Sequence, residues 1–169
     1  MIKVIRIYGG KVTMELRNIH LESDKDMIIK FRRDTYTISN GTEKGFDEDS
    51  YLNRMSRRID KFPNGQLIVE KDNKAIGQLG LLVQDYCGKS IGYINLIYLI
   101  PKYRARGYGR KMLKYAEEFF RKLSLDEYHL RVSSTNKNAF EFYRNFGMKK
   151  ICEENRKNKI FLMAKALDK

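Results

Sequence analysis

Residues that bind transition metals or form disulfides are scarce in this chain. It contains two cysteines, Cys87 and Cys152, and two histidines, His20 and His129. The cysteines do not form a CxxC pair and the histidines stand singly, so no group of residues has the spacing of a metal-binding motif. We therefore expect no metal site and no disulfide.

Long apolar runs are also missing. The chain has no stretch of 18 apolar residues, and it does not open with a charged and then apolar leader that ends in a small-residue cleavage site. These absences predict neither a membrane span nor a signal peptide, which makes a cytoplasmic protein the default expectation. No internal repeat, low-complexity tract or linker interrupts the 169 residues, so we expect a single domain, 1–169.

Acidic residues are outnumbered, since 34 Lys and Arg against 21 Asp and Glu give a formal net charge of +13. Such a charge raises the hypothesis of a nucleic-acid-binding module, because counterion release favours basic faces on phosphate backbones. The basic residues are spread along the whole chain, however, without a helix-turn-helix or stacking-aromatic pattern. Arg54, Arg57, Arg58 and Lys61 fit the solvated face of one helix. We interpret the net positive charge as a feature that keeps the protein soluble and attracts an anionic ligand.

Hydrophobic periodicity predicts alternating groups of strands and helices. Helices are expected at 26–37 and 48–62, with a polar loop that contains two glycines between them. A first strand is expected around 12–16, and its hairpin partner at 2–7 would turn through Gly9 and Gly10. The remaining predicted strands are 66–71, 75–84, 90–100, 129–132, 149–153 and 159–164.

The most informative segment is residues 97–113, IYLIPKYRARGYGRKML. An apolar strand leads into a turn with Gly107 and Gly109, and an amphipathic helix follows. Glycine lets the backbone turn sharply and approach a ligand, and a helix N-terminus offers unpaired N–H groups to an anion. Six Lys or Arg and no acidic residue stand between Lys102 and Lys114. This combination predicts a phosphate-binding turn.

The spacing narrows the kind of phosphate site. A Walker A loop and a dinucleotide fingerprint both fail, because Met112 stands where each needs a glycine. The remaining pattern is R-x-x-G-x-G, from Arg104 through Gly107 to Gly109. With the preceding strand and Pro101, it resembles the acetyl-coenzyme A motif of the GNAT superfamily of N-acetyltransferases.

A second segment, residues 132–148, resembles the other signature of that superfamily in Asn136, Ala139, Tyr143 and Gly147. The residues themselves agree with a short helix: Asn136 suits its N-cap, apolar side chains share one face, and Gly147 suits the position after its C-cap. Two such motifs in this order identify the chain as a GNAT member. The resemblance is good from about residue 66 to residue 167 and loose over the first 65 residues.

The resemblance implies a fold and an activity. The fold would be α+β, with a mixed, mostly antiparallel central sheet flanked by helices and with strands splayed apart at the cofactor site. The activity would be transfer of an acetyl group from acetyl-coenzyme A, as co-substrate, to a primary amine by direct attack in a ternary complex.

Site residues follow from the same resemblance. Tyr143 would be the general acid that protonates the leaving thiolate, although it could be only a core aromatic. Asn136 would bind the pantetheine or only cap its own helix. The cofactor-binding residues that the resemblance implies are Ile97, Tyr98, Leu99, Arg104, Ala105, Arg106, Gly107, Tyr108, Gly109, Arg110, Asn136, Ala139 and Tyr143.

The general base is left open by the sequence. Many family members use a Glu on the strand before the phosphate turn, and the aligned position holds Asn95, with Leu96 beside it. Neither accepts a proton at neutral pH. Asp85, or a water relay held by Tyr98 or Asn95, are the two alternatives.

The acceptor is open as well. Glu43, Asp47, Glu48 and Asp49 make the loop between the first two helices acidic, so they could attract a cationic amine or serve only the start of the next helix. A small polyamine-like or aminoglycoside-like amine and a peptide N-terminus or lysine all remain candidates, for a monomer or a homodimer. A non-catalytic acetyl-coenzyme A sensor is the alternative to an enzyme, and a nucleic-acid-binding module is a more distant one.

Overall fold

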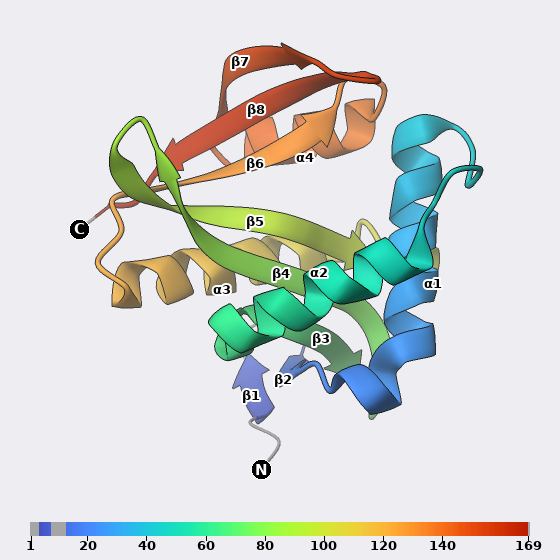
Figure 1. Cartoon of the computed structure of the whole chain (residues 1–169). Coiled ribbons are helices and arrows are strands. Elements are labelled where there is room, and N and C mark those ends of the chain that lie inside the picture. The colour runs from blue at the N-terminus through green and yellow to red at the C-terminus, as the bar shows by residue number, and fades with distance from the viewer. Residues whose placement is uncertain (1–3, 8–12, 169) are drawn as a thin grey trace.

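Eight strands form one mixed sheet in the computed structural model, which describes residues 4–7 and 13–168 (Figure 1). The strands lie in the order β1-β2-β3-β4-β5-β6-β8-β7, and β5 and β6 are parallel while the other neighbours are antiparallel. Their bounds are β1 Val4–Ile7, β2 Met14–Asn18, β3 Gln66–Lys71, β4 Lys74–Tyr86, β5 Lys89–Leu99, β6 Glu127–Ser133, β7 Lys149–Asn155 and β8 Lys159–Ala166. The predicted mixed, mostly antiparallel α+β sheet is therefore confirmed.

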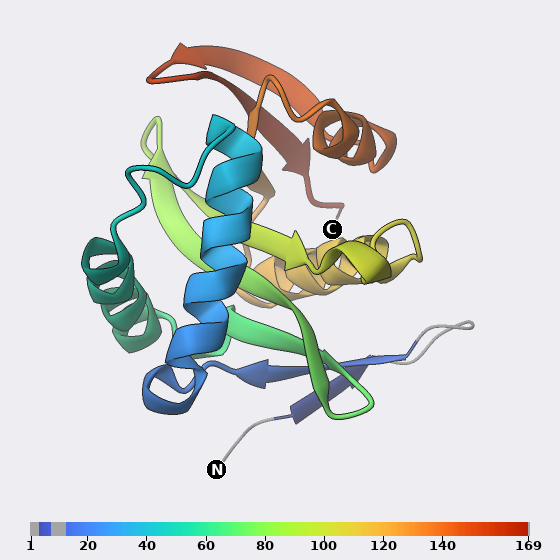
Figure 2. The ribbon, with the colours of Figure 1, turned by 90° about the vertical axis from the view of Figure 1, so that its right-hand side faces the viewer.

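Helices cover both faces of this sheet, as Figure 2 shows in side view. One layer holds α1 Leu21–Asn40 and α2 Glu48–Lys61, and the other holds α3 Tyr108–Lys122 and α4 Lys137–Asn145. Short 3-10 turns, η1 Pro63–Gly65 and η2 Pro101–Tyr103, precede β3 and the glycine turn. None of the helices among the described residues has the length and apolar character needed to cross a membrane.

The apolar stripe of α3 explains why this helix lies against the sheet. Met112, Leu113, Ala116 and Phe120 recur at helical spacing and are fully buried. They pack in one cluster with the buried side chains of β4, β5 and β6. A second, smaller cluster joins α1 and α2 to the opposite face of the sheet through Ile68.

The first helix is longer than the predicted 26–37, because polar contacts fix both of its ends. At its start, Asp24 is 5 % exposed and accepts hydrogen bonds from the Arg17 guanidinium (Nη1 to Oδ2, 2.7 Å) and from the His20 amide (2.8 Å). At its end, Gly41 adopts a left-handed conformation with φ 74° and donates to the Thr37 carbonyl. Apolar periodicity alone does not detect such contacts.

The predicted N-terminal hairpin is confirmed in its strands. Val4 to Ile7 pair with Arg17 to Met14 in antiparallel register. The turn that we placed at Gly9 and Gly10, as well as Val12, lies outside the described residues.

The central strands diverge, as the resemblance implied. β5 and β6 are joined by the three pairs Gly92–Tyr128, Tyr93–His129 and Ile94–Leu130. Beyond them β5 continues along β4 as far as Leu99, while β6 continues along β8 as far as Ser133. The backbone of 95–99 therefore keeps one edge that no neighbouring strand covers.

Candidate active site

A cavity of about 1180 Å³ opens between the diverging ends of β5 and β6. Its walls come from α1, β5, the turn before α3, β6, α4 and the turn between β7 and β8. The predicted site residues that line it are Asn95, Ile97, Tyr98, Leu99, Arg104, Ala105, Gly107, Gly109, Arg110, Asn136, Ala139 and Tyr143. The structure thus brings both sequence motifs to one cavity, although they are about thirty residues apart in the chain.

The glycine turn presents the start of α3 to this cavity. Gly107 is the N-cap residue with φ 86°, and the Lys111 amide makes the first bond of the helix, to the Gly107 carbonyl (3.2 Å). The amides of the three residues before Lys111 therefore have no acceptor within the helix. A Cβ at Gly107 would meet nothing within 4 Å, so the space beside this residue is open.

Three further residues of the glycine turn and the start of α3 shape the same end of the cavity. A Cβ at Gly109 would lie 3.0 Å from Phe142 Cζ, so the glycine allows α3 and α4 to approach closely. The Arg104 Nε donates to the Leu99 carbonyl (2.8 Å), which holds this cation against the end of β5. The Arg110 guanidinium lies 5.4 Å from the centre of the Phe146 ring.

Two predicted cofactor residues do not line the cavity. Arg106 is exposed on the outside of the turn. The Tyr108 side chain is 3 % exposed and packs in the core, with its ring 5.6 Å from that of Tyr103. Only the backbone of Tyr108 is therefore available at the start of α3.

The second motif builds α4 and carries Tyr143 into the cavity. The Asn136 Oδ1 accepts from the Ala139 amide (3.2 Å), so Asn136 caps its own helix, and Gly147 follows the helix with φ 95°. The Tyr143 side chain is 7 % exposed, and burial raises the pKa of its hydroxyl well above the ordinary value. This phenol therefore keeps its proton at neutral pH, and among the described residues it has no hydrogen-bond partner for that proton.

The candidate base Asp85 is not brought to the cavity. It is exposed at the end of β4, opposite Ser90, and its Oδ1 accepts from the Gly88 amide (3.2 Å) in the β4–β5 turn. Among the residues that the structure describes, no Asp or Glu lines the cavity directly.

A carboxylate that the sequence analysis did not single out is connected to the cavity through one tyrosine hydroxyl. The Tyr98 hydroxyl, on a residue that lines the cavity, donates to Asp34 Oδ2 of α1 at 2.5 Å. Burial, followed by this contact, raises the pKa of Tyr98 well above its ordinary value. Asp34 follows the buried Phe31 by three residues, so the helical period would have placed it on the sheet-facing side if the burial of Phe31 had been recognised.

A β-bulge controls the direction of Asn95. Gly80 pairs with Leu96 and Leu81 pairs with Ile94, which leaves Asn95 as an extra residue in β5. Its side chain lies over Gly80, where a Cβ would come within 2.5 Å of the Asn95 amide nitrogen. With the amide oriented to satisfy both of its partners, the nitrogen donates to the Gly80 carbonyl (3.1 Å) and the oxygen accepts from Arg58 Nη1 (3.1 Å).

The acidic loop serves the start of α2. The Asp47 Oδ1 accepts from the Ser50 amide (2.9 Å) as the N-cap, and Glu48 forms an ion pair with Arg33. Neither these two residues nor Glu43 and Asp49 line the cavity. The capping interpretation is thus confirmed for Asp47.

These features agree with what comparison with known proteins shows. The chain belongs to the acetyltransferase (GNAT) family, whose model matches residues 26–148. Thialysine N-epsilon-acetyltransferase of Mus musculus is 26 % identical over 112 residues, which are 64 % of this chain and 62 % of that protein. The match thus spans less than two thirds of the length of that relative.

Solved structures show the same fold. Ard1 from Thermoplasma volcanium superposes with a TM-score of 0.73 at 14 % identity, over 94 % of this chain and 100 % of that one. The PaiA N-acetyltransferase from Thermoplasma acidophilum, solved in complex with coenzyme A, gives 0.71 at 20 % identity, over 92 % and 99 %. At these identities the likeness concerns the fold alone.

Proposed function

We propose that this protein transfers an acetyl group from acetyl-coenzyme A to a primary amine, by direct attack of the amine in a ternary complex. The observation that carries the proposal is the cavity between β5 and β6, which the glycine turn closes at one end and Tyr143 lines from α4. Its cationic side chains include Arg104 and Arg110, and no carboxylate of the described chain faces them there. A polyanionic donor suits such a site, as does the coenzyme A in the PaiA structure.

The donor would be held mainly by backbone. The amides at the start of α3 and the helix dipole would bind the pyrophosphate, because both favour an anion at that end. The uncovered edge of β5 would hold the pantetheine through Ile97, Tyr98 and Leu99. When bound, acetyl-coenzyme A supplies a thioester whose acetyl group an amine can attack.

Tyr143 would supply the proton that the departing sulfur needs. As the C–N bond forms and the C–S bond breaks, the negative charge that develops on sulfur is relieved by the Tyr143 Oη–H. A thiol has an ordinary pKa near 8.5, so it leaves fairly readily and the acid need contribute only part of the rate.

Asp34 takes the place of Asp85 in our proposal for the proton acceptor. An amine with a pKa near 10 must lose a proton before or during the attack. The Tyr98 hydroxyl can accept that proton while passing its own to Asp34, with which it is already hydrogen-bonded at 2.5 Å. The sequence left open a water relay held by Tyr98 or Asn95, and the relay from Tyr98 to Asp34 is a different route that the structure suggests.

A non-catalytic acetyl-coenzyme A sensor is the second candidate. The observation in its favour is that no carboxylate among the described residues lines the cavity itself. Binding without turnover would identify such a sensor.

The test combines thermal unfolding with thiol release. We expect saturating acetyl-coenzyme A to raise the melting temperature, because a ligand at about 100 times its dissociation constant stabilises the folded state by about 2.7 kcal/mol. We also expect coenzyme A to be released when a panel of amines is added. An unmoved melting temperature would contradict the whole assignment, whereas a shift without thiol release from any amine would favour the sensor.

A further inference from the structure

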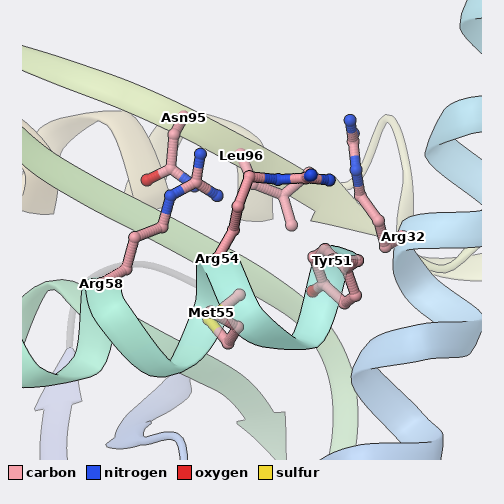
Figure 3. Close-up of a pocket in the computed structure, with 7 residues that line it drawn as sticks. All are labelled: Arg32, Tyr51, Arg54, Met55, Arg58, Asn95 and Leu96. Atoms are coloured by element: carbon pink, nitrogen blue, oxygen red, sulfur yellow. The ribbon is translucent and has the colours of Figure 1, made fainter. Parts of the chain in front are cut away.

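A second, smaller cavity lies on the α2 side of the β5 bulge. It has a volume of about 50 Å³ and is lined by Arg32, Tyr51, Arg54, Met55, Arg58, Asn95 and Leu96. Figure 3 shows Arg54 and Arg58 extending from α2 toward Leu96 and Asn95, with Arg32 extending from α1 on the other side of Arg54. The volume admits about three or four water molecules, which is the size of one carboxylate or phosphate group.

The three guanidinium groups have no acidic partner within the described part of the chain. Two of the side chains form hydrogen bonds with described residues: Arg54 Nη1 donates to Ser50 Oγ (2.5 Å), and Arg58 Nη1 donates to the Asn95 oxygen (3.1 Å). Arg32 forms neither an ion pair nor a side-chain hydrogen bond with the described residues. Arg17 and Arg131, which are also partly buried, differ in this respect, since each contacts a carboxylate at 2.7 Å.

Burial and mutual repulsion act on this group of arginines. Desolvation, and then the charge of Arg54, lower the pKa of both Arg32 and Arg58. Arg32 and Arg58 are half-buried and Arg54 is exposed. Partly desolvated cations without a counter-ion are unfavourable, so a cavity lined by them is favourable for an anion that forms charge-assisted hydrogen bonds. The site is therefore complementary to an oxyanion in both size and charge.

The position of the small cavity connects this oxyanion to the acceptor. Asn95 and Leu96 line both cavities, and so does Arg32, so the two spaces adjoin at these three residues. The bulge produces this arrangement, because it turns two consecutive β5 side chains to the side of α1 and α2. A molecule with its amine in the large cavity can therefore place a nearby group among the arginines.

We propose that the acceptor is an amine that carries a carboxylate or phosphate group a few bonds away, and that Arg32, Arg54 and Arg58 bind this anion. The proposal rests on the proposed function, since it names the substrate class of the same site. It places a positive surface where the acidic loop would have suggested a negative one, and it disfavours a polyamine-like acceptor.

The first experiment measures anion binding independently of turnover. The protein is saturated with acetyl-coenzyme A, so that the glycine turn is occupied, and its melting temperature is followed with added inorganic phosphate or acetate against chloride at equal ionic strength. We expect phosphate, acetate or both to raise the melting temperature, and the difference between them separates a phosphate site from a carboxylate site. Arg32→Gln should abolish the rise.

Arg57→Gln is the matched control. Arg57 belongs to the same helix, is exposed and donates to the Asn53 carbonyl (3.3 Å), but it does not line the small cavity. This variant removes the same charge and should keep the anion effect. An equal loss in Arg32→Gln and Arg57→Gln, or no anion effect in the wild-type protein, would overturn the proposal.

The second experiment measures selectivity in turnover. Amino acids are compared with their carboxamides, and phosphoethanolamine with ethanolamine, at equal concentrations of unprotonated amine. We expect kcat/KM to favour the anionic member of at least one pair by about ten-fold or more, because bonds to charged groups are among the stronger hydrogen bonds. Arg32→Gln and Arg58→Gln should remove most of that preference while Arg57→Gln retains it.

Failure of the proposal is distinguishable from failure of the proposed function. If acetyl-coenzyme A does not shift the melting temperature, the acetyltransferase assignment itself fails. If acetyl-coenzyme A does shift the melting temperature, and neutral amines are acetylated with the same kcat/KM as anionic ones, only the proposal of the anion site is wrong. Equal losses for both members of a pair in Arg58→Gln would show that Arg58 serves only to hold Asn95.

Discussion

The two ends of the active-site region are constructed by different means. In our proposal the donor end consists largely of backbone groups from two continuous segments, the turn at 104–110 and the edge of β5. The acceptor end consists of side chains that come from α1, α2 and the bulge in β5. Backbone groups can bind the invariant part of a shared donor, whereas side chains can change with the acceptor. We infer that the donor end reflects the family and the acceptor end reflects this particular chain.

The largest effect is expected at the donor end, from Gly107→Val. Gly107 has φ 86°, which a β-branched residue resists, and its missing Cβ leaves the approach to the α3 amides open. Cofactor affinity should fall by at least about 100-fold, given strain of roughly 1–3 kcal/mol and the lost access. Isothermal calorimetry on a variant with native circular dichroism measures this.

Gly88→Val is the control for that substitution. Gly88 has φ 76°, a Cβ there would also meet nothing within 4 Å, and it lies in the β4–β5 turn away from the cavity. It imposes a comparable strain without touching the site. Similar cofactor affinities for the two variants would mean that the turn does not bind the phosphates.

A smaller effect is expected where the two ends meet, from Tyr143→Phe. The variant keeps the ring and loses the proton donor, so kcat should fall by about ten- to 100-fold with cofactor affinity nearly intact. The raised pKa of Tyr143 keeps this donor protonated through neutral pH, so its ionisation should not limit activity there.

Two comparisons support the interpretation of that variant. The defect should be smaller for an acyl donor whose thiol has a lower pKa, because such a thiol needs less help in leaving. Tyr115→Phe, on α3 and outside the cavity, should have the wild-type rate. If Tyr143→Phe has the wild-type rate under conditions in which the chemical step is rate-limiting, Tyr143 serves only as a packed aromatic residue.

The smallest effect is expected at the acceptor end, from Asp34→Asn. The amide cannot take the proton that Tyr98 would pass on, so kcat at neutral pH should fall by about ten-fold, below the usual range for a general base, because the acceptor can also lose its proton to water. The defect should shrink as pH rises toward the pKa of the amine, near 10, where more acceptor is already unprotonated. A pH profile of kcat tests this, with the exposed Asp26→Asn as control. A defect that does not change with pH would contradict the relay.

The same contrast explains how much the sequence revealed. The local geometry of the proposed donor end was predictable because Arg104, Gly107 and Gly109 are close in the chain and their effect is local, as are the cap at Asn136 and the glycine at 147. The mixed, mostly antiparallel sheet and the splay of its strands came from the family resemblance, and the structure confirms them. These features depend on short segments whose geometry is fixed by a few residues.

The acceptor end was not predictable for physical reasons. Arg54, Arg57 and Arg58 all fitted a solvated helix face, and only the packing of α2 against β5 separates Arg57 from the other two. The bulge at Asn95 is a property of the pairing between β4 and β5, so nothing in β5 alone indicates it. Asp34 and Tyr98 meet across 64 residues of chain. Asp85 looked available because its place at the end of a predicted strand does not show which end of the sheet holds the cavity; in the structure it lies at the end of β4 beside the β4–β5 turn and does not line the cavity.

The short join between β5 and β6 has a consequence for motion. Three residue pairs connect these strands, whereas ten connect β4 to β5 and seven connect β6 to β8. The sheet therefore consists of two strongly laddered parts with a weak seam, and local opening should begin where the ladder is shortest. A substrate that spans the cavity would contact both parts of the sheet and so stabilise the β5–β6 pairing at the point where the two strands diverge. Amide hydrogens at 92–94 should then exchange with solvent more slowly in the occupied protein. Binding at the site would therefore be detectable as a lower rate of local opening of the sheet.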